Sequence, residues 1–343
     1  MRASRRQILS NKLLPLALSA IMAGAFFASR LCQLAWAHSP SPPTARTTQI
    51  VTWGSLGGCD CRGQILKPTP EPHQKGLDVE ELQQRLRELG YYFGPINGVY
   101  GPDTWKAVRQ FKANLGLPPD AVVDEATWEA LGYGIEIPIS KDPLPPPEEP
   151  IAITIDTDRK RLMVYSKGDL YSEFPVAVGK PETPTPRGEW KIIYKGRDWG
   201  GGFGTRWLGL NVPWGIYGIH GTNKPWSIGT AASHGCIRMF NHHVEQLWEW
   251  VKVGTPVTIV GPPGFPDYWS FRTIEPKAVG PDVVEVQKRL RQEGLYWSWI
   301  DGSYGDATIR AVKYFQALQG LPITGVVDRK TYQALGLKII EWD

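Results

Sequence analysis

An internal repeat constrains this chain more than any other feature. Residues 76–101, GLDVEELQQRLRELGYYFGPINGVYG, match residues 280–305, GPDVVEVQKRLRQEGLYWSWIDGSYG, and the match continues to VVDEATWEALG and VVDRKTYQALG. The offset stays at 204 positions, as from 97 to 301 and from 101 to 305. About half of the roughly 57 aligned positions are identical, which is too strong for chance. The repeat predicts two copies of one structural unit on either side of a different middle block.

Each copy has the pattern of a small three-helix unit. An apolar stripe at helical spacing runs from Val79 to Leu89, and a second stripe follows the NG turn. Asp78, with Glu81 three places on, predicts a capping box at the first helix, and the second copy repeats the pair. Asp124 is expected to open a short third helix.

Proline-rich segments separate the blocks. Proline fixes its own φ and restricts the residue before it, so these segments predict semi-extended spacers that tether the units. The predicted organisation is a signal peptide or signal anchor over 1–37, a Pro/Gly-rich linker over 38–75, the first unit over 76–132, a Pro-rich linker over 133–150, the middle domain over 151–260, a linker over 261–278 and the second unit over 279–337.

The N-terminus has the pattern of an export signal. A basic stretch over residues 1–12 precedes an apolar run over 13–29, and AWA at 35–37 offers small residues at cleavage spacing. The export route stays open, because SRRQIL resembles a twin-arginine signal with Ile8 where Phe is usual. Left uncleaved, the segment would be the chain's one membrane anchor. The body of the protein is expected outside the cytoplasm.

The charge balance excludes one class of partner. The chain holds 38 basic and 34 acidic residues, a net charge of +4, and no Lys/Arg-rich tract beyond the signal. Proteins that bind nucleic acid concentrate basic residues on one face. We therefore expect no nucleic-acid partner.

The middle block, residues 151–260, has the pattern of a mostly-β domain. IAITIDT at 151–157 alternates apolar with smaller or polar residues, as a strand with one buried face does. RLMVYS, FPVAVG, WKIIYK and PVTIV are further short segments rich in β-branched residues. HHVEQLWEWVK at 242–252 places its apolar residues on one helical face and predicts a single helix.

The residues that can carry chemistry gather in IHGTN at 219–223 and SHGCIRM at 233–239. A cysteine nucleophile acts as its thiolate, which is scarce at neutral pH unless a base takes the proton. His220 can be that base for Cys236 and can return the proton to a leaving amine. In the glycine turn, the N–H groups of Gly235 and Cys236 are candidates for stabilising an oxyanion.

Two other interpretations of Cys236 stay open on residue types alone. A lone cysteine is commonly a buried core residue, although that leaves the neighbouring histidines and arginine unexplained. A zinc site is the other alternative, although the paired ligand spacing typical of structural zinc is missing. Its ligands would be His220, His234, Cys236 and His242 or His243.

The repeat units resemble the peptidoglycan-binding domain family. That family's pattern, Asp/Asn-Gly-x-aromatic-Gly and then Thr, Ala-Val, Phe, Gly-Leu and Asp, occurs in both copies. The resemblance implies that both units hold the cell-wall polymer. Helical spacers without a ligand are the alternative.

The middle block resembles the L,D-transpeptidase catalytic domain family, the YkuD family. The family motif is a first histidine, then Ser/Thr-His-Gly-Cys with Arg or Asn two places on, and this chain fills every position. The resemblance implies a multidomain α+β protein, with a mostly-β, sandwich-like catalytic domain between two small three-helix domains. It also implies that the enzyme needs no metal or organic cofactor.

The resemblance assigns roles within the motif. Cys236 is the nucleophile, and His220 is the proton acceptor and donor. His234 and Gly235 support the site or its oxyanion hole, and Ser233 orients His234.

Two further assignments concern the substrate. Arg238 pairs with a substrate carboxylate or forms a structural salt bridge, and both alternatives stay open. The glycine- and aromatic-rich segment at 200–218 is expected to form a wall or lid of the substrate groove. His73, His242 and His243 have no motif support and are expected at the surface.

The remaining cysteines are expected to leave the nucleophile unpaired. Cys32 departs with the signal if the signal is cleaved. Cys59 and Cys61 are separated by a single residue, which would strain a disulfide between them. The sequence gives no role for these two.

The function implied by the resemblance is peptidoglycan L,D-transpeptidation in the cell wall or periplasm. A stem peptide is cut after its third residue, a thioester forms, and an amine of another stem gives a 3-3 cross-link. The expected partners are peptidoglycan stem peptides and glycan, with carbapenem β-lactams as inhibitors. The alternatives are an L,D-carboxypeptidase that trims tetrapeptide stems and a non-catalytic wall-binding scaffold.

Overall fold

The computed structural model describes residues 65–132, 134–135, 144–261 and 272–337. The predicted export signal and Cys32, Cys59 and Cys61 lie outside these residues. In the described part of the chain, no helix is both long and apolar enough to cross a membrane.

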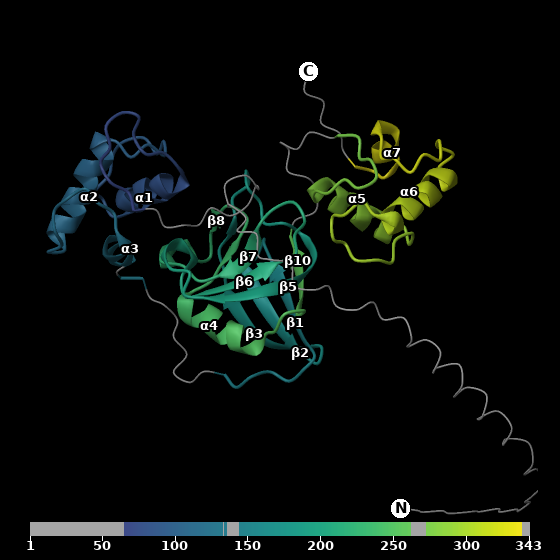
Figure 1. The fold of residues 1–343 in the computed structure, drawn as a ribbon, viewed down its shortest axis with the longest axis horizontal. Helices are drawn as coiled ribbons and strands as arrows, with labels where there is room; N and C mark the ends of the chain where they lie inside the picture. Colours follow the sequence, from purple (N-terminus) through teal and green to yellow (C-terminus); the bar gives the residue numbers. More distant parts are fainter. Residues whose placement is uncertain (1–64, 133, 136–143, 262–271, 338–343) are drawn as a thin grey trace, which may run out of the picture. The chain divides into compact units, whose positions relative to one another are not determined.

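Both repeat units fold as predicted, into three helices each (Figure 1). The N-terminal module has α1 (Leu77–Glu88), α2 (Pro102–Asn114) and α3 (Glu125–Leu131). The C-terminal module has α5 (Pro281–Gln292), α6 (Asp306–Leu318) and α7 (Arg329–Ala334). The predicted stripe is the buried face of α1, with Val79, Leu82 and Leu86 almost fully buried.

Of the two helix caps predicted for the N-terminal module, the one at α3 is present and the one at α1 is not. Asp124 caps α3 by accepting a hydrogen bond from the Thr127 amide at 2.9 Å. The capping box predicted at Asp78 and Glu81 is wrong, because α1 begins after Gly76 and no side chain caps it. Both carboxylates instead reach the middle domain, as described below.

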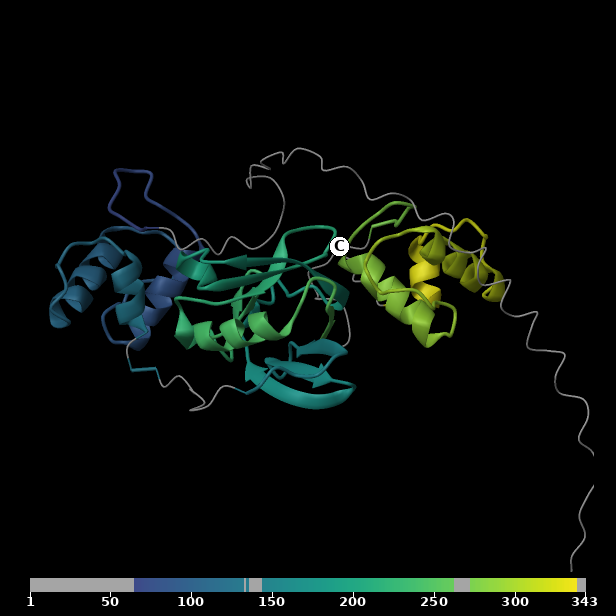
Figure 2. The ribbon, with the colours of Figure 1, turned by 60° about the horizontal axis from the view of Figure 1, so that its bottom comes forward.

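The middle domain is built on a curled eight-stranded sheet, in agreement with the predicted mostly-β class (Figures 1 and 2). The strand order is β3-β2-β1-β10-β5-β6-β7-β9, and β4 and β8 form a separate pair. The strands are β1 (Ile151–Asp156), β2 (Arg161–Ser166), β3 (Asp169–Pro175), β4 (Val178–Gly179), β5 (Gly188–Arg197), β6 (Arg206–Leu210), β7 (Tyr217–His220), β8 (Ala231–Ser233), β9 (Ile237–Arg238) and β10 (Pro256–Val260).

The predicted helix is α4 (Asn241–Trp250), which packs against β6 and β7. Its apolar face, including Val244 and Leu247, is buried in the core. Because α4 follows β9 after two residues, it fixes the segment that carries the cysteine motif against the sheet. Two short 3-10 turns, η1 (Gly201–Phe203) and η2 (Pro225–Ser227), complete the domain.

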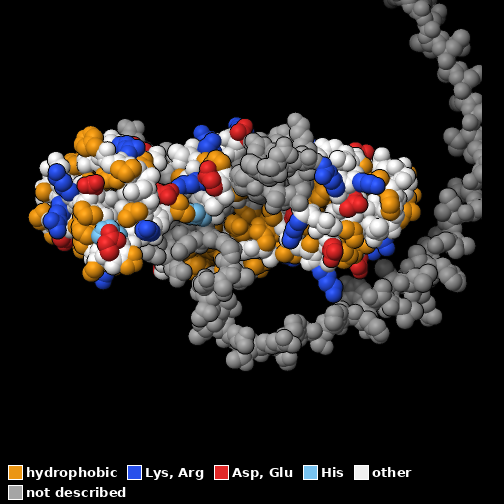
Figure 3. Space-filling model, turned by 90° about the horizontal axis from the view of Figure 1, so that it is seen from above, with side chains coloured by type: hydrophobic (Ala, Val, Ile, Leu, Met, Phe, Trp, Pro, Cys, Tyr) orange, Lys and Arg blue, Asp and Glu red, His pale blue; other side chains and the backbone are white. Residues whose placement is uncertain are grey.

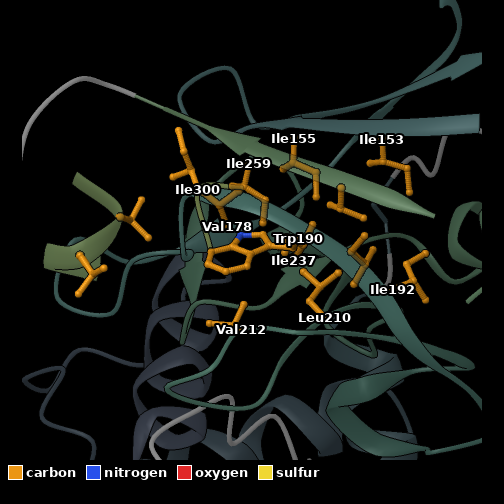
Figure 4. Close-up of a cluster of buried hydrophobic side chains, with 14 of the residues drawn as sticks. Ile153, Ile155, Val178, Trp190, Ile192, Leu210, Val212, Ile237, Ile259 and Ile300 are labelled. Atoms are coloured by element: carbon orange, nitrogen blue, oxygen red, sulfur yellow. The ribbon is translucent and has the colours of Figure 1, made fainter. Parts of the chain in front are cut away.

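The core lies between the strands and is centred on Trp190 (Figure 4). Alternate residues of β1, such as Ile153 and Ile155, point into it, as their spacing predicts. Ile300 of the C-terminal module belongs to the same buried cluster and lies near Ile259 in Figure 4. Removing a buried aliphatic side chain of this kind costs about 2–5 kcal/mol.

The C-terminal module is held to the middle domain by more than its spacer. The Glu189 amide donates to the Ile300 carbonyl at 2.8 Å, and the Glu189 carboxylate pairs with the Arg291 guanidinium. Tethering by the spacers alone is therefore not what the structure shows. Sequence patterns identify the separate units but not the surfaces through which they meet.

Basic and acidic side chains are interspersed over the face drawn in Figure 3. Neither sign gathers into a large patch on that face, which agrees with a net charge of +4.

Candidate active site

The predicted base and nucleophile lie on neighbouring strands. His220 is the last residue of β7, and Cys236 directly precedes β9. The two strands are parallel, with Ile219 opposite Ile237 and His220 opposite Arg238. The pairing therefore brings two motifs that are separate in sequence to one end of the sheet.

The His220 imidazole is held in one orientation. Its Nδ1 lies 2.5 Å from the Gly221 carbonyl oxygen. A carbonyl can only accept, so Nδ1 carries the hydrogen and Nε2 is left as the acceptor. Phe203 contacts the ring edge-on at 5.2 Å between centroids, and Trp207 stacks on it at 5.5 Å.

The surroundings also keep His220 neutral. The pKa of His220 falls from its usual 6.5 to about 3, because burial, and to a lesser extent the charge of Arg238, outweigh the opposing effect of the Gly221 and Phe203 backbone. Nε2 is buried and makes no hydrogen bond of ordinary geometry within the described residues. A neutral imidazole with an available Nε2 is the form that a general base needs.

Cys236 shares the aromatic surroundings of the base. It is fully buried and clusters with Phe203 and Trp207, the two residues that contact His220. The expectation of an unpaired thiol is wrong for this structure, because Cys236 is disulfide-bonded. Sequence spacing does not show which cysteines meet in space. The chain's other cysteines, Cys32, Cys59 and Cys61, lie outside the described residues.

Ser233 has a different role from the one predicted. Its hydroxyl donates to the Cys236 carbonyl at 2.5 Å and accepts from the Gly235 amide at 3.1 Å. The side chain therefore braces the turn that presents Cys236 and makes no hydrogen bond to either ring nitrogen of His234. Because the Gly235 amide is already used, the prediction that it faces an oxyanion is not met in this structure.

The turn requires glycine at position 235. Gly235 has φ 102°, in the left-handed region that other residues rarely adopt. A Cβ there would lie 2.7 Å from the ring of Tyr217 and 3.2 Å from the Pro184 carbonyl oxygen. Both the backbone angle and the lack of space therefore select glycine.

Arg238 is bound by a carboxylate from the N-terminal module. Its Nη2 donates to Glu81 Oε1 at 3.0 Å, and only 2% of Arg238 is exposed. Of the two predicted roles, the structure shows the ion pair. This pair joins the catalytic motif to helix α1.

Lys224 completes this charged cluster, and the motifs gave no sign of it. Its Nζ lies 2.6 Å from Glu81 Oε2 and also pairs with Asp78. The Lys224 ammonium lies 4.7 Å from the centre of the Trp128 ring, a cation–π contact. Asp78 is 146 positions away in sequence, so no local pattern links the two residues.

Glu81 is ionised by these cations despite its burial. Burial by itself raises the pKa of Glu81, but the charges and hydrogen bonds of Arg238 and Lys224 outweigh it and bring the value from 4.5 to about 2. The cluster is thus a buried set of opposite charges that satisfy one another.

His234 lies on the wall of a cavity of about 620 Å³, within the usual size of ligand sites. Trp214 and Tyr217, from the segment 200–218, also line it, whereas His220 and Cys236 do not. Burial lowers the pKa of His234, and the nearby Glu81 carboxylate partly offsets this. The charged lining residues are Lys75, Asp78, Glu182, Arg187, Glu285 and Lys288.

In the part of the chain that the structure describes, no group of three or more His, Cys, Asp or Glu side chains is placed to hold a metal ion. The histidines of these residues therefore do not form a metal site there. The expectation that His73, His242 and His243 lie at the surface is wrong. All three are half-buried: His73 contacts Trp105, and the other two contact the Phe240 ring.

Comparison with known proteins matches each block to a family. Residues 150–259 match the L,D-transpeptidase catalytic domain YkuD, and residues 75–131 and 279–335 match a peptidoglycan binding domain.

The relatives agree with this assignment. The chain is 43% identical over 157 residues to L,D-transpeptidase YkuD of Bacillus licheniformis, covering 45% of this chain and 88% of that protein. It is 46% identical over 128 residues to L,D-transpeptidase YkuD of Bacillus subtilis, covering 37% and 75%. An L,D-transpeptidase structure from Xylanimonas cellulosilytica shares 26% identity over 56% of this chain and 100% of that one, with a TM-score of 0.29. By its sequence relatives and its catalytic domain, the chain belongs to the YkuD family of L,D-transpeptidases, with a peptidoglycan-binding domain on each side.

Proposed function

We propose that this protein forms 3-3 cross-links in peptidoglycan through a thioester on Cys236. The observation that carries the proposal is the buried, neutral His220 imidazole. Its Nδ1 contacts the Gly221 carbonyl, and its Nε2 makes no hydrogen bond to the part of the chain that the structure describes. Phe203 and Trp207 pack against both His220 and Cys236, so the base and the nucleophile share one buried aromatic environment.

The first half-reaction breaks an amide of the donor stem peptide. His220 takes the thiol proton, and the Cys236 sulfur attacks the carbonyl carbon of the third residue. The carbon–nitrogen bond to the fourth residue then breaks, and His220 protonates the departing amine. The products are a thioester on Cys236 and a free D-amino acid.

The second half-reaction uses an amine from another stem. The amine attacks the thioester, His220 takes its proton, and the cysteine thiol leaves with that proton. An amide has been exchanged for an amide, so the reaction needs no nucleotide. If water resolves the thioester instead, the same residues make an L,D-carboxypeptidase that trims tetrapeptide stems.

The disulfide adds one requirement. A disulfide sulfur has no thiolate, so Cys236 becomes a nucleophile only after reduction by a thiol or phosphine. Reduction adds two electrons and two protons and releases two thiols. Assays of the protein therefore need parallel samples with and without a reductant.

The two flanking domains place the enzyme in the cell wall. We propose that both bind peptidoglycan, that residues 1–37 direct export, and that carbapenem β-lactams acylate Cys236. A wall-binding scaffold without activity is disfavoured by the oriented His220 imidazole, which a purely structural domain does not need.

The test is incubation of the reduced protein with purified tetrapeptide muropeptides, followed by mass analysis. Cross-linked dimers with tripeptide donors support the transpeptidase. Tripeptide monomers alone identify a carboxypeptidase, and unchanged substrate with an intact Cys236 thiol rejects both enzymes in favour of the scaffold.

A further inference from the structure

The C-terminal module contains a receptor for a carboxylate, and Glu189 of the catalytic domain occupies it. Arg291 donates to both carboxylate oxygens of Glu189, one from each terminal nitrogen. The Ile300 amide donates to Glu189 Oε2 at 3.1 Å. The Ile300 carbonyl accepts from the Glu189 amide at 2.8 Å. The receptor therefore binds an ionised carboxylate together with the peptide N–H of the same residue.

The N-terminal module carries the same groups at the same positions. With the offset of 204, Arg87 corresponds to Arg291, and Ile96 corresponds to Ile300. Arg291 is steadied by donating from Nη2 to the Ser298 carbonyl, and Arg87 donates from Nη2 to the carbonyl of the corresponding Gly94. The two guanidinium groups are thus held in the same way by their own loops.

The two copies differ in what occupies the receptor. Ile300 is 6% exposed under the catalytic domain, whereas Ile96 is 38% exposed and Arg87 is an exposed residue. Within the described residues, no protein group pairs with the Ile96 amide or carbonyl, and Arg87 makes no ion pair. The N-terminal module therefore exposes to solvent the groups with which the C-terminal module holds Glu189.

An exposed aromatic side chain lies beside both receptors. Phe93 and its counterpart Trp297 are each 87% exposed. Both copies therefore expose a large aromatic ring at the same position, three residues before the isoleucine of the receptor. It supplies an apolar face next to the carboxylate receptor, as sites for amphipathic ligands often do.

We propose that Arg87 and the backbone of Ile96 bind a carboxylate-bearing stem peptide of peptidoglycan, with Phe93 against its apolar atoms. The filled copy defines the ligand chemistry: a planar carboxylate and a peptide N–H on one residue, which stem peptides supply and glycan hydroxyls do not. Charge-assisted pairing of arginine with both carboxylate oxygens is strong and directional. The proposal takes from the proposed function only that the polymer is peptidoglycan, not that the enzyme cross-links it.

The two copies of this receptor then have different tasks, whatever other surface each module offers to the wall. The C-terminal module uses its receptor to dock onto Glu189 and become part of the catalytic unit. The N-terminal module keeps the equivalent receptor for the wall. The same surface of the repeat thus serves once inside the protein and once outside it.

The test compares the full chain with Arg87→Ala, Arg87→Lys and Arg109→Ala in pelleting with purified sacculi. Arg109 is an exposed arginine on α2 of the same module and is the matched control for lost charge. We expect Arg87→Ala to weaken binding about three- to tenfold, since an exposed but bidentate pair is worth about 1 kcal/mol. Arg87→Lys should recover only part of this, and Arg109→Ala should bind as the unchanged protein.

Two competitors identify the source of the carboxylate. Soluble tetrapeptide muropeptide should release the full chain from sacculi, and the same muropeptide with its carboxylates amidated should not. Glycan strands stripped of peptide should retain the protein poorly and without dependence on Arg87.

Three results would overturn the proposal: Arg87→Ala pelleting like the unchanged protein, equal losses in Arg87→Ala and Arg109→Ala, or equal competition by the amidated muropeptide. Turnover of soluble muropeptides distinguishes failure of this binding proposal from failure of the proposed reaction. Arg87→Ala should keep it, and a protein without any turnover would count against the proposed reaction while leaving the binding result intact.

Discussion

Arg238, two residues after the cysteine of the catalytic motif, donates a hydrogen bond at 3.0 Å to Glu81 of the N-terminal module, 157 positions away in the sequence. Both side chains are almost completely removed from water. A residue of the catalytic motif is therefore neutralised from outside the catalytic domain. The module is part of the electrostatic environment of the active site as well as a candidate wall anchor.

Glu81→Gln should destabilise the protein strongly, because it leaves two buried cations without their shared carboxylate. Breaking a buried ion pair from one side costs about 3–5 kcal/mol, and because Lys224 keeps its pairing with Asp78, we expect a loss of about 3 kcal/mol. The measurement is calorimetric unfolding. The control is Glu80→Gln, next in sequence, whose partly exposed pair with Lys180 at 3.5 Å should contribute less than about 1 kcal/mol. Equal effects of the two substitutions would contradict the account.

The same ion pair predicts a pH dependence of stability. The pKa of Glu81 is about 2 in the folded protein and 4.5 ordinarily, so the folded state favours the ionised form. The stabilisation is complete above about pH 4.5 and is lost as the pH falls from there toward 2. The difference in unfolding free energy between the unchanged protein and Glu81→Gln should therefore shrink across this window. A difference that stays constant from pH 6 to 3 would show that ionisation of Glu81 is not its source.

His220→Ala should slow acylation of the reduced protein by about 10²–10⁴-fold, the usual cost of removing a general base. His234→Gln should have a much smaller effect, because His234 lies on the cavity wall and neither of its ring nitrogens is hydrogen-bonded to a residue that the structure describes. Stopped-flow acylation by a carbapenem measures both rates. If His234→Gln is the slower variant, the roles of the two histidines are reversed.

Gly235→Ala should abolish acylation, because its Cβ would collide with Tyr217 and displace the turn that carries Cys236. Gly229→Ala is the matched control: Gly229 also has a positive φ, 88°, but a Cβ there meets nothing within 4 Å. Placing alanine in this conformation costs about 1–2 kcal/mol by itself. The control should lose that stability and keep its acylation rate, and equal rates for both variants would contradict the steric argument.

Much of the architecture follows from local sequence patterns. The apolar stripe from Val79 to Leu86 and the alternation along β1 predict elements that the structure contains, because burial of one face depends on spacing within a short segment. The fully matched motif around Cys236 likewise identifies the catalytic domain before any contact is known.

Long-range contacts are what the sequence does not reveal. Glu81 has the spacing of a capping box, yet its carboxylate binds Arg238 and Lys224, since a buried cation competes better for it than a backbone amide does. Ser233 braces the Gly235–Cys236 turn, and this depends on how the turn folds back on the hydroxyl. The pairing of Cys236 and the docking of Arg291 on Glu189 depend in the same way on tertiary structure.

The central claim is that the sulfur of Cys236 carries the acyl group, and intact-protein mass spectrometry tests it most directly. The reduced full chain, its Cys236→Ala variant and an unreduced sample are each incubated with tetrapeptide muropeptide or a carbapenem. The account predicts an acyl adduct on the reduced protein, none on Cys236→Ala, and none before reduction. An adduct of equal yield on Cys236→Ala would contradict the account and place the nucleophile elsewhere.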